Sequence, residues 1–142
     1  MEKLLEQYNQ VNHFGADHNF KLTVIQPGEI IYEMEVLSKH MATPVAAHGG
    51  MISAMMDGVI GVAALSKVAE EGKIVSTVEF KINYFRPAHL GDILTGNGKV
   101  DHAGKRIIHT SGIIYNQNKE IIAKAIGTLN AYPSEKGELY SK

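Results

Sequence analysis

The sequence from His48 to Leu65 reads HGGMISAMMDGVIGVAAL, and this stretch decides the fold. Asp57 is the only charged residue between Gly49 and Ser66, and nearly all the others are apolar or small. The pattern predicts one long helix from Gly49 to about Glu70, with Gly72 as its C-terminal cap. This helix is apolar around most of its circumference, so other elements must enclose it.

Strands are predicted on both sides of this helix. Before it, strands at 20–25 and 30–37 flank the turn Pro27-Gly28-Glu29, and a short amphipathic helix ending near Gly15 precedes them. After it, alternation predicts a half-buried strand that buries Val78, Phe80, Ile82 and Tyr84. Three further strands are expected at 92–101, 106–116 and 120–132. The order predicts a single α+β domain over residues 1–142, with a mostly antiparallel sheet curled around the helix.

The composition narrows the classes of function. Fourteen basic residues nearly balance fifteen acidic ones, which argues against a broad nucleic-acid surface. The absence of cysteine excludes thiolate nucleophiles and thiolate metal sites, and the seven histidines show no helical metal-ligand spacing, so no metal is expected. The N-terminus lacks the apolar stretch of a secretory signal, and an Asp inside the apolar helix argues against a membrane span. The expectation is a cytoplasmic protein with no membrane partner.

Asp57 is the first candidate functional residue. Ser53 and Gly61 lie one helical turn on either side of it, so the three form a narrow stripe of small or polar residues. A carboxylate is costly to bury without a partner, and small neighbours leave room for a ligand. Pattern alone favours a functional Asp57 and a structurally paired Asp57 about equally.

The glycines at the helix start are the second candidate feature. Gly49 and Gly50 allow a ligand to approach the backbone, and the first N–H groups of a helix can polarise a carbonyl. Gly49 and Asp57 are separated by about 12 Å along the helix axis, which is too far for one small group to touch both. If both serve one site, two antiparallel copies of the helix must supply them across a two-fold axis.

Two motifs give the sequence a resemblance to a known family. The segment His48-Gly49-Gly50 followed by Asp57 resembles the helix motif of hotdog-fold acyl-CoA thioesterases of the phenylacetate-degradation (PaaI) type. The strand 77–88, TVEFKINYFRPA, and the following Leu90-Gly91-Asp92 resemble that family's next strand and turn. The resemblance covers about residues 40–132 and implies the hotdog fold.

The resemblance also implies roles. Asp57 would be the nucleophile or general base, the Gly49 N–H would polarise the thioester carbonyl, and His48 would help to place it. Thr77 falls where the family often has a Ser or Thr that positions the attacking water. The substrate would be an acyl-CoA, contacted by Gly50, Ser53, Gly61 and Arg86; no separate cofactor is expected, and the assembly would be a homodimer or a dimer of dimers.

One departure and two alternatives accompany this hypothesis. The family commonly has an amide six residues before the His, where this chain has Ala42; His40 is a candidate substitute. A non-catalytic acyl-CoA-binding module and a hotdog dehydratase or hydratase are the alternative functions. The presence of Asp57 argues against the first, and the absence of a matching His and acidic pair argues against the second. The acyl group stays open.

Overall fold

The computed structural model describes residues 2–136 of the 142-residue chain. Its helices are α1 (Glu2–Val11), α2 (His13–Asp17) and α3 (Gly49–Val68). Its strands are β1 (Lys21–Gln26), β2 (Glu29–Glu35), β3 (Met41–Thr43), β4 (Ala46–Ala47), β5 (Lys73–Tyr84), β6 (Ile93–Ala103), β7 (Ile107–Tyr115) and β8 (Ile121–Pro133). Single 3-10 turns are η1 (Ser38–His40), η2 (Ala69–Glu71) and η3 (Ser134–Lys136).

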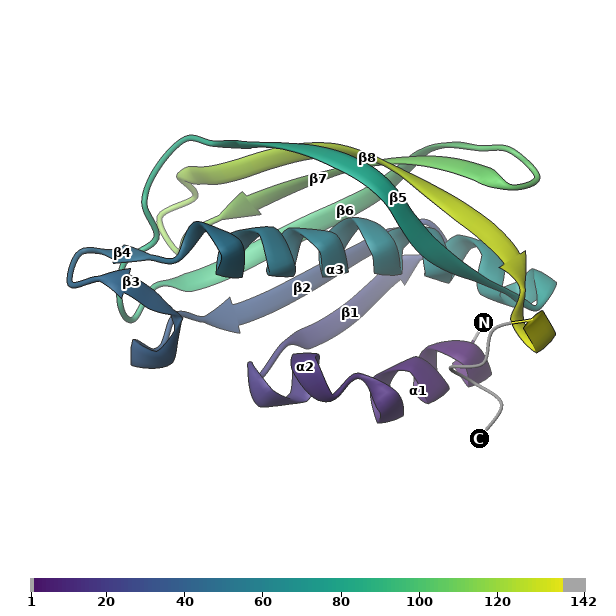
Figure 1. Ribbon diagram of the computed structural model, residues 1–142, viewed down its shortest axis with the longest axis horizontal. Helices are drawn as coiled ribbons and strands as arrows, with labels where there is room; N and C mark the ends of the chain where they lie inside the picture. Colours follow the sequence, from purple (N-terminus) through teal and green to yellow (C-terminus); the bar gives the residue numbers. More distant parts are fainter. Residues whose placement is uncertain (1, 137–142) are drawn as a thin grey trace.

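Six strands form one antiparallel sheet in the order β1-β2-β6-β7-β8-β5. Helix α3 lies across its concave face and packs against β2, β5, β6, β7 and β8 (Figure 1). Helices α1 and α2 lie on the side of α3 that the sheet leaves open (Figure 1). The predicted α+β architecture, a sheet wrapped around one long helix, is confirmed.

Close approach of the sheet to α3 explains how such an apolar helix is enclosed. A Cβ on Gly98 would lie 2.2 Å from the Val59 carbonyl oxygen, and one on Gly112 would lie 2.7 Å from the Met56 sulfur. Only glycine fits at these two positions, because real Cβ contacts are longer. The helix has the length and apolar composition of a membrane span, but most of it is buried against the sheet. It is the core helix of this domain.

Strand β5 contains a β-bulge at Val78. Thr77 pairs with Leu129 and Glu79 pairs with Thr128, so Val78 has no partner across the ladder. A bulge shifts the alternation of faces by one residue, so Thr77 and Phe80 both lie on the face toward α3. The predicted burial of Val78 is therefore wrong, since it is 59% exposed.

The predicted element boundaries hold within a few residues, with three differences. The first helix is interrupted at Asn12, whose side-chain oxygen accepts from the Gly15 N–H and caps α2. The stretch expected to be irregular contains the small hairpin β3-β4. Strand β6 continues to Ala103, so the next turn lies at 104–106. The Gly72 cap is confirmed by its positive φ of 70°.

Candidate active site

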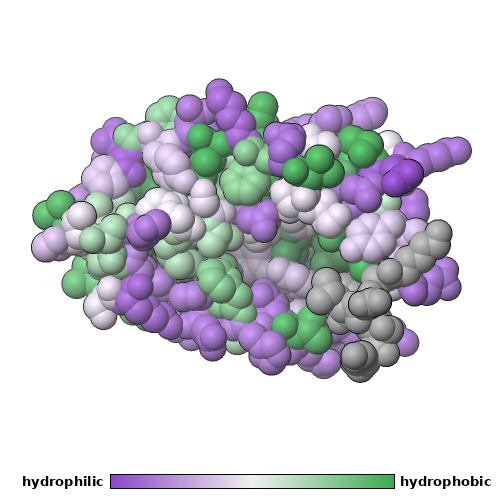
Figure 2. All heavy atoms as spheres, in the orientation of Figure 1, coloured by the Kyte–Doolittle hydropathy of each residue, from purple (hydrophilic) through white to green (hydrophobic). Residues whose placement is uncertain are grey.

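A pocket of about 520 Å³ lies between α3, β5 and the N-terminal helices. The surface view shows this face hollowed near its centre (Figure 2). Of the residues between 2 and 136 that line the pocket, Asp57 is the only charged one. The others are aromatic, aliphatic, small or neutral polar: Tyr8, Asn12, Phe14, Phe20, Tyr32, Ala54, Gly58, Gly61, Val62, Leu65, Val75, Thr77 and Leu129. A pocket of this size and character suits an apolar ligand with one reacting group near the carboxylate.

The stripe of small and polar residues on α3 is the part of the helix that the sheet leaves uncovered. Ser53, Asp57 and Gly61 are each half-buried, whereas Met56 and Ile60 beside them are buried. The sheet buries the apolar sides of the helix, so the stripe faces the open side. Asp57 and Gly61 line the pocket, while Ser53 lies nearer the helix start.

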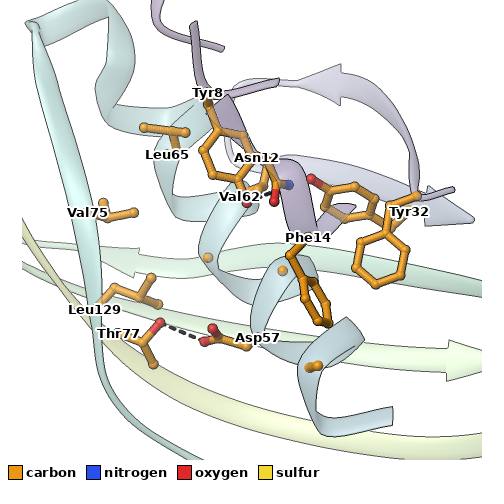
Figure 3. Close-up of a pocket in the computed structure, with 14 residues that line it drawn as sticks. Tyr8, Asn12, Phe14, Tyr32, Asp57, Val62, Leu65, Val75, Thr77 and Leu129 are labelled. Carbon is orange, nitrogen blue, oxygen red and sulfur yellow. Dashed lines mark hydrogen bonds between the residues drawn. The ribbon is translucent and has the colours of Figure 1, made fainter. Parts of the chain in front are cut away.

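Asp57 and Thr77 meet at one end of the pocket (Figure 3). The Thr77 hydroxyl donates a hydrogen bond of 2.7 Å to Asp57 Oδ1. Thr77 immediately precedes the bulge at Val78, and the bulge allows both Thr77 and the residues beyond it to face α3. The bond fixes the orientation of the carboxylate and leaves its second oxygen, Oδ2, available for chemistry.

The start of α3 presents an unused backbone donor. The His48 Nδ1 accepts from the Gly50 N–H at 2.8 Å, and the His48 N–H donates to the His40 carbonyl. His48 therefore caps the helix and fixes its first turn. Among the residues that the structure describes, no group accepts from the Gly49 N–H. A Cβ on Gly50 would lie 2.8 Å from His48 Nδ1, so the space beside Gly50 holds the capping ring.

Tyr84 reaches the same helix turn from β5. Its hydroxyl donates to the Gly49 carbonyl at 3.1 Å, and it lies 2.7 Å from Ser53 Oγ. Because the Tyr84 proton is used on the carbonyl, the Ser53 hydroxyl must be the donor in the second bond. Sequence reasoning placed Tyr84 only as a buried strand residue, but it is half-exposed. The missed signal was the pairing of the Tyr84 hydroxyl on β5 with Ser53 on α3.

Gly49 and Asp57 do not share a pocket within one chain. Gly49 lines a second hollow of about 350 Å³ with Tyr84 and Arg86, and the described residues that line this hollow are all different from those that line the first. Arg86 is 56% exposed and forms a 3.2 Å ion pair with Glu120. The chain thus separates the carboxylate from the helix-start donor, as the 12 Å helical spacing predicts.

His40 is not available as a substitute for an amide near the site. Its side chain is 2% exposed. The Leu37 N–H donates to His40 Nδ1 at 2.9 Å, so neutral His40 carries its proton on Nε2 and donates to His18 Nδ1 at 2.8 Å. Both ring nitrogens are therefore occupied, and the suggestion that His40 replaces the missing amide at Ala42 is wrong. The His18–His40 bond instead ties the loop after α2 to η1.

This histidine pair makes the fold sensitive to acid. Burial lowers the pKa of His40 below its usual value, and the neighbouring His18 and Lys39 lower it further. The unfolded chain therefore binds a proton on His40 at a pH where the folded chain does not, so stability falls as the pH drops below about 6.5. We expect His40→Gln to reduce the loss of unfolding free energy between pH 7.5 and pH 5.5, measured by urea denaturation. The exposed His109→Gln is the control, and equal pH dependence in wild type and His40→Gln would contradict the assignment.

Comparisons with known proteins show which family the chain resembles. The family model for the thioesterase superfamily matches residues 46–123. Human acyl-coenzyme A thioesterase 13 is 30% identical over 99 residues, which cover 68% of this chain and 69% of that protein. The range matched by the family model, residues 46–123, contains the helix α3, Thr77 and Tyr84.

Solved structures of other proteins are similar to this chain in fold. Streptococcus mutans smu.793, solved with acetyl CoA bound, is 30% identical with a TM-score of 0.74, over 81% of this chain and 90% of that one. The E. coli PaaI protein of the phenylacetic acid degradation operon has a TM-score of 0.84 at 20% identity, over 90% of both chains. The second likeness shows a shared fold.

Proposed function

The chain belongs to the thioesterase superfamily as a hotdog-fold acyl-CoA thioesterase, and from this premise we propose that Asp57 is its catalytic carboxylate. The observation that carries the proposal is the Thr77–Asp57 hydrogen bond, in a pocket where Asp57 is the only charged residue of the described lining. A carboxylate held by one bond on Oδ1 keeps Oδ2 free to act on a thioester.

The pocket supports either of two routes for Asp57. As a general base, Oδ2 takes a proton from water while the water oxygen attacks the thioester carbonyl carbon. As a nucleophile, Oδ2 attacks that carbon itself, and water then hydrolyses the resulting anhydride. In both routes the C–S bond breaks and CoA leaves as the thiolate. Thr77 orients the carboxylate throughout.

The Gly49 N–H is the proposed donor to the thioester oxygen. This N–H lies at the positive end of α3, where it can stabilise the negative charge that develops on the oxygen. His48 supports this role by capping the same turn through the Gly50 N–H. Gly49 and Asp57 lie in separate hollows, so we propose that two chains related by a two-fold axis supply them to one site. The smallest active unit is then a homodimer, and two dimers can associate into a tetramer.

The CoA and the acyl group of the substrate can both lie near Gly49 and Asp57. Arg86 lines the hollow that contains Gly49 and is half-exposed. Its guanidinium can release Glu120 and bind a CoA phosphate instead. Gly61 and the pocket wall receive the acyl group. Hydrolysis needs only water as a second reactant, so the proposal includes no cofactor, and its proposed location is the cytoplasm.

A panel of acyl-CoAs with free thiol release as the readout tests the proposed function. The expected result is hydrolysis of at least one acyl-CoA, with free acid and CoA as the products. Binding without thiol release would favour a non-catalytic acyl-CoA-binding module. Formation of an enoyl or hydroxyacyl product with CoA still attached would favour a dehydratase or hydratase.

Tyr84→Phe tests whether the Ser53–Tyr84–Gly49 chain positions the helix start. The substitution keeps the ring but removes the bond to the Gly49 carbonyl, so the Gly49 N–H loses part of its support. The loss of one hydrogen bond predicts a fall in kcat of about 5- to 10-fold, larger than the change in KM. Tyr115→Phe on β7 lies outside both hollows and is the matched control. A Tyr84→Phe variant with wild-type kcat would remove Tyr84 from this role.

A further inference from the structure

The end of the main pocket opposite Asp57 is built by the N-terminal part of the chain. Tyr8 and Asn12 come from α1 and the α1–α2 junction, and Tyr32 comes from β2. Their polar atoms converge away from Asp57 and Thr77 (Figure 3). These three residues lie outside residues 46–123, so the family match says nothing about them.

The three residues, here called the Tyr8–Asn12–Tyr32 cluster, carry hydrogen-bond donors that are not all paired within the described structure. Each hydroxyl carries one proton, and the Asn12 amide carries two. Asn12 Nδ2 donates to the Tyr8 oxygen at 3.2 Å, while Asn12 Oδ1 is occupied by the Gly15 N–H at 3.0 Å. The buried Tyr32 hydroxyl has no partner with hydrogen-bond geometry among the described residues. Tyr8 itself only accepts in this cluster, so its own proton has no acceptor among the described residues.

The two tyrosine hydroxyls of the cluster keep their protons at physiological pH and can donate hydrogen bonds. Burial raises the pKa of Tyr8 and that of Tyr32 above the ordinary range. Both hydroxyls are therefore protonated and neutral. The Tyr32 hydroxyl is shielded from solvent and Tyr8 is only partly buried, so a ligand in the pocket meets Tyr8 and Asn12 first.

Asn12 has a structural role as the cap of α2, but the surrounding wall gives the two tyrosine hydroxyls no stabilising partner. Phe14, Phe20, Val62 and Leu65 line the same pocket and are apolar. A donor buried in such a wall without an acceptor destabilises the fold, and phenylalanine would fill the same space without that cost. A ligand that enters the pocket can supply the missing acceptor.

Resting on the proposed function, we propose that the Tyr8–Asn12–Tyr32 cluster selects acyl groups that carry a neutral hydrogen-bond acceptor remote from the thioester. An ether, keto or hydroxyl oxygen fits this requirement. A carboxylate does not, because no cation is among the described residues that line the pocket and the Asp57 charge would repel it. A plain hydrocarbon chain leaves the donors unmatched and is the poorer substrate.

Pairs of acyl-CoAs that differ by one atom test this selection. In 4-methoxybutanoyl-, 5-methoxypentanoyl- and 6-methoxyhexanoyl-CoA, an ether oxygen replaces one methylene of hexanoyl-, heptanoyl- and octanoyl-CoA. The oxygen accepts hydrogen bonds but cannot donate them, and the three lengths place it at different depths. The measured quantity is the ratio of kcat/KM for the ether to that for its hydrocarbon partner.

We expect this ratio to exceed one for at least one chain length in the wild type. It should fall by about 5-fold or more in Tyr8→Phe, the scale of losing one hydrogen bond, and by less in Tyr32→Phe, whose hydroxyl is shielded and acts through Tyr8. Two near-isosteric variants are used so that a folding defect in one does not stop the test, and Tyr115→Phe should keep the wild-type ratio. Hydrolysis with the same ratios in wild type and both variants would overturn the selection alone. A wild type that hydrolyses none of the six compounds or the wider panel would overturn the proposed function as well.

Discussion

Replacing Asp57 with Asn is expected to lower kcat by roughly 100-fold or more, the usual scale for losing a general base or nucleophile. The Asn side chain keeps the shape of Asp57, and its amide oxygen can still accept the hydrogen bond from Thr77. The substitution therefore removes the charge and the reactive oxygen while the pocket keeps its geometry. Steady-state hydrolysis of the best acyl-CoA in the panel measures the effect.

A matched aspartate separates chemistry from structure in this experiment. Asp101 on β6 also accepts a hydroxyl hydrogen bond, from Ser111 at 3.1 Å, but it does not line the pocket. Asp101→Asn should leave turnover unchanged. If Asp57 were only structural, Asp57→Asn would lower the melting temperature while the folded protein kept its turnover per site.

Substitution of Gly49 has the second largest expected effect. A Cβ at Gly49 would lie 3.8 Å from the Tyr84 ring, an ordinary contact, so the chain itself tolerates a side chain there. The substrate oxygen must approach the Gly49 N–H from the open side, and a branched side chain blocks that approach. We expect Gly49→Val to lower kcat/KM by about 100-fold or more, a scale taken from the loss of an oxyanion donor.

The neighbouring glycine provides a contrasting variant. A Cβ on Gly50 displaces the His48 ring, which would lie only 2.8 Å away. Gly50→Ala should therefore destabilise the fold by about 1 kcal/mol through loss of the helix cap. Gly49→Val should lose activity with little change in stability. Equal kinetics for wild type and a folded Gly49→Val would show that Gly49 does not contact the substrate.

The fold was predictable from the sequence because its main signals are local. The apolar helix, its Gly72 cap and the strand alternation each depend on nearest-neighbour chemistry, and all three were placed within a few residues. The bulge at Val78 was not predictable in this way. The residues around Val78 carry no sequence signal of a bulge. The bulge depends on how β5 pairs with β8 and on the contact of Thr77 with α3. The sequence pattern therefore misassigned Val78 to the buried face.

The site was predictable in its motif and unpredictable in its surroundings. The helix motif placed Asp57 and Gly49, and the family resemblance added Thr77, which the structure brings to Asp57. The Tyr84 bonds, the His18–His40 pair and the polar end of the pocket join segments that are far apart in sequence. Such contacts depend on tertiary packing, and no spacing rule along one chain reveals them.

The central claim is that one active site takes Asp57 from one chain and Gly49 from its partner. Two inactive variants test this claim directly, because the Asp57→Asn chain keeps Gly49 intact and the Gly49→Val chain keeps Asp57 intact. The two chains are mixed in equal amounts, unfolded and refolded together, and hydrolysis is compared with each variant refolded alone. Only a mixed dimer can pair the two intact halves, and it does so at one of its two sites.

If the chains pair at random, about a quarter of all sites become complete. The account therefore predicts that the mixture regains about a quarter of wild-type activity, while each variant alone stays near zero. A refolded mixture that is no more active than its two components would place Asp57 and Gly49 in one chain's site and contradict the account.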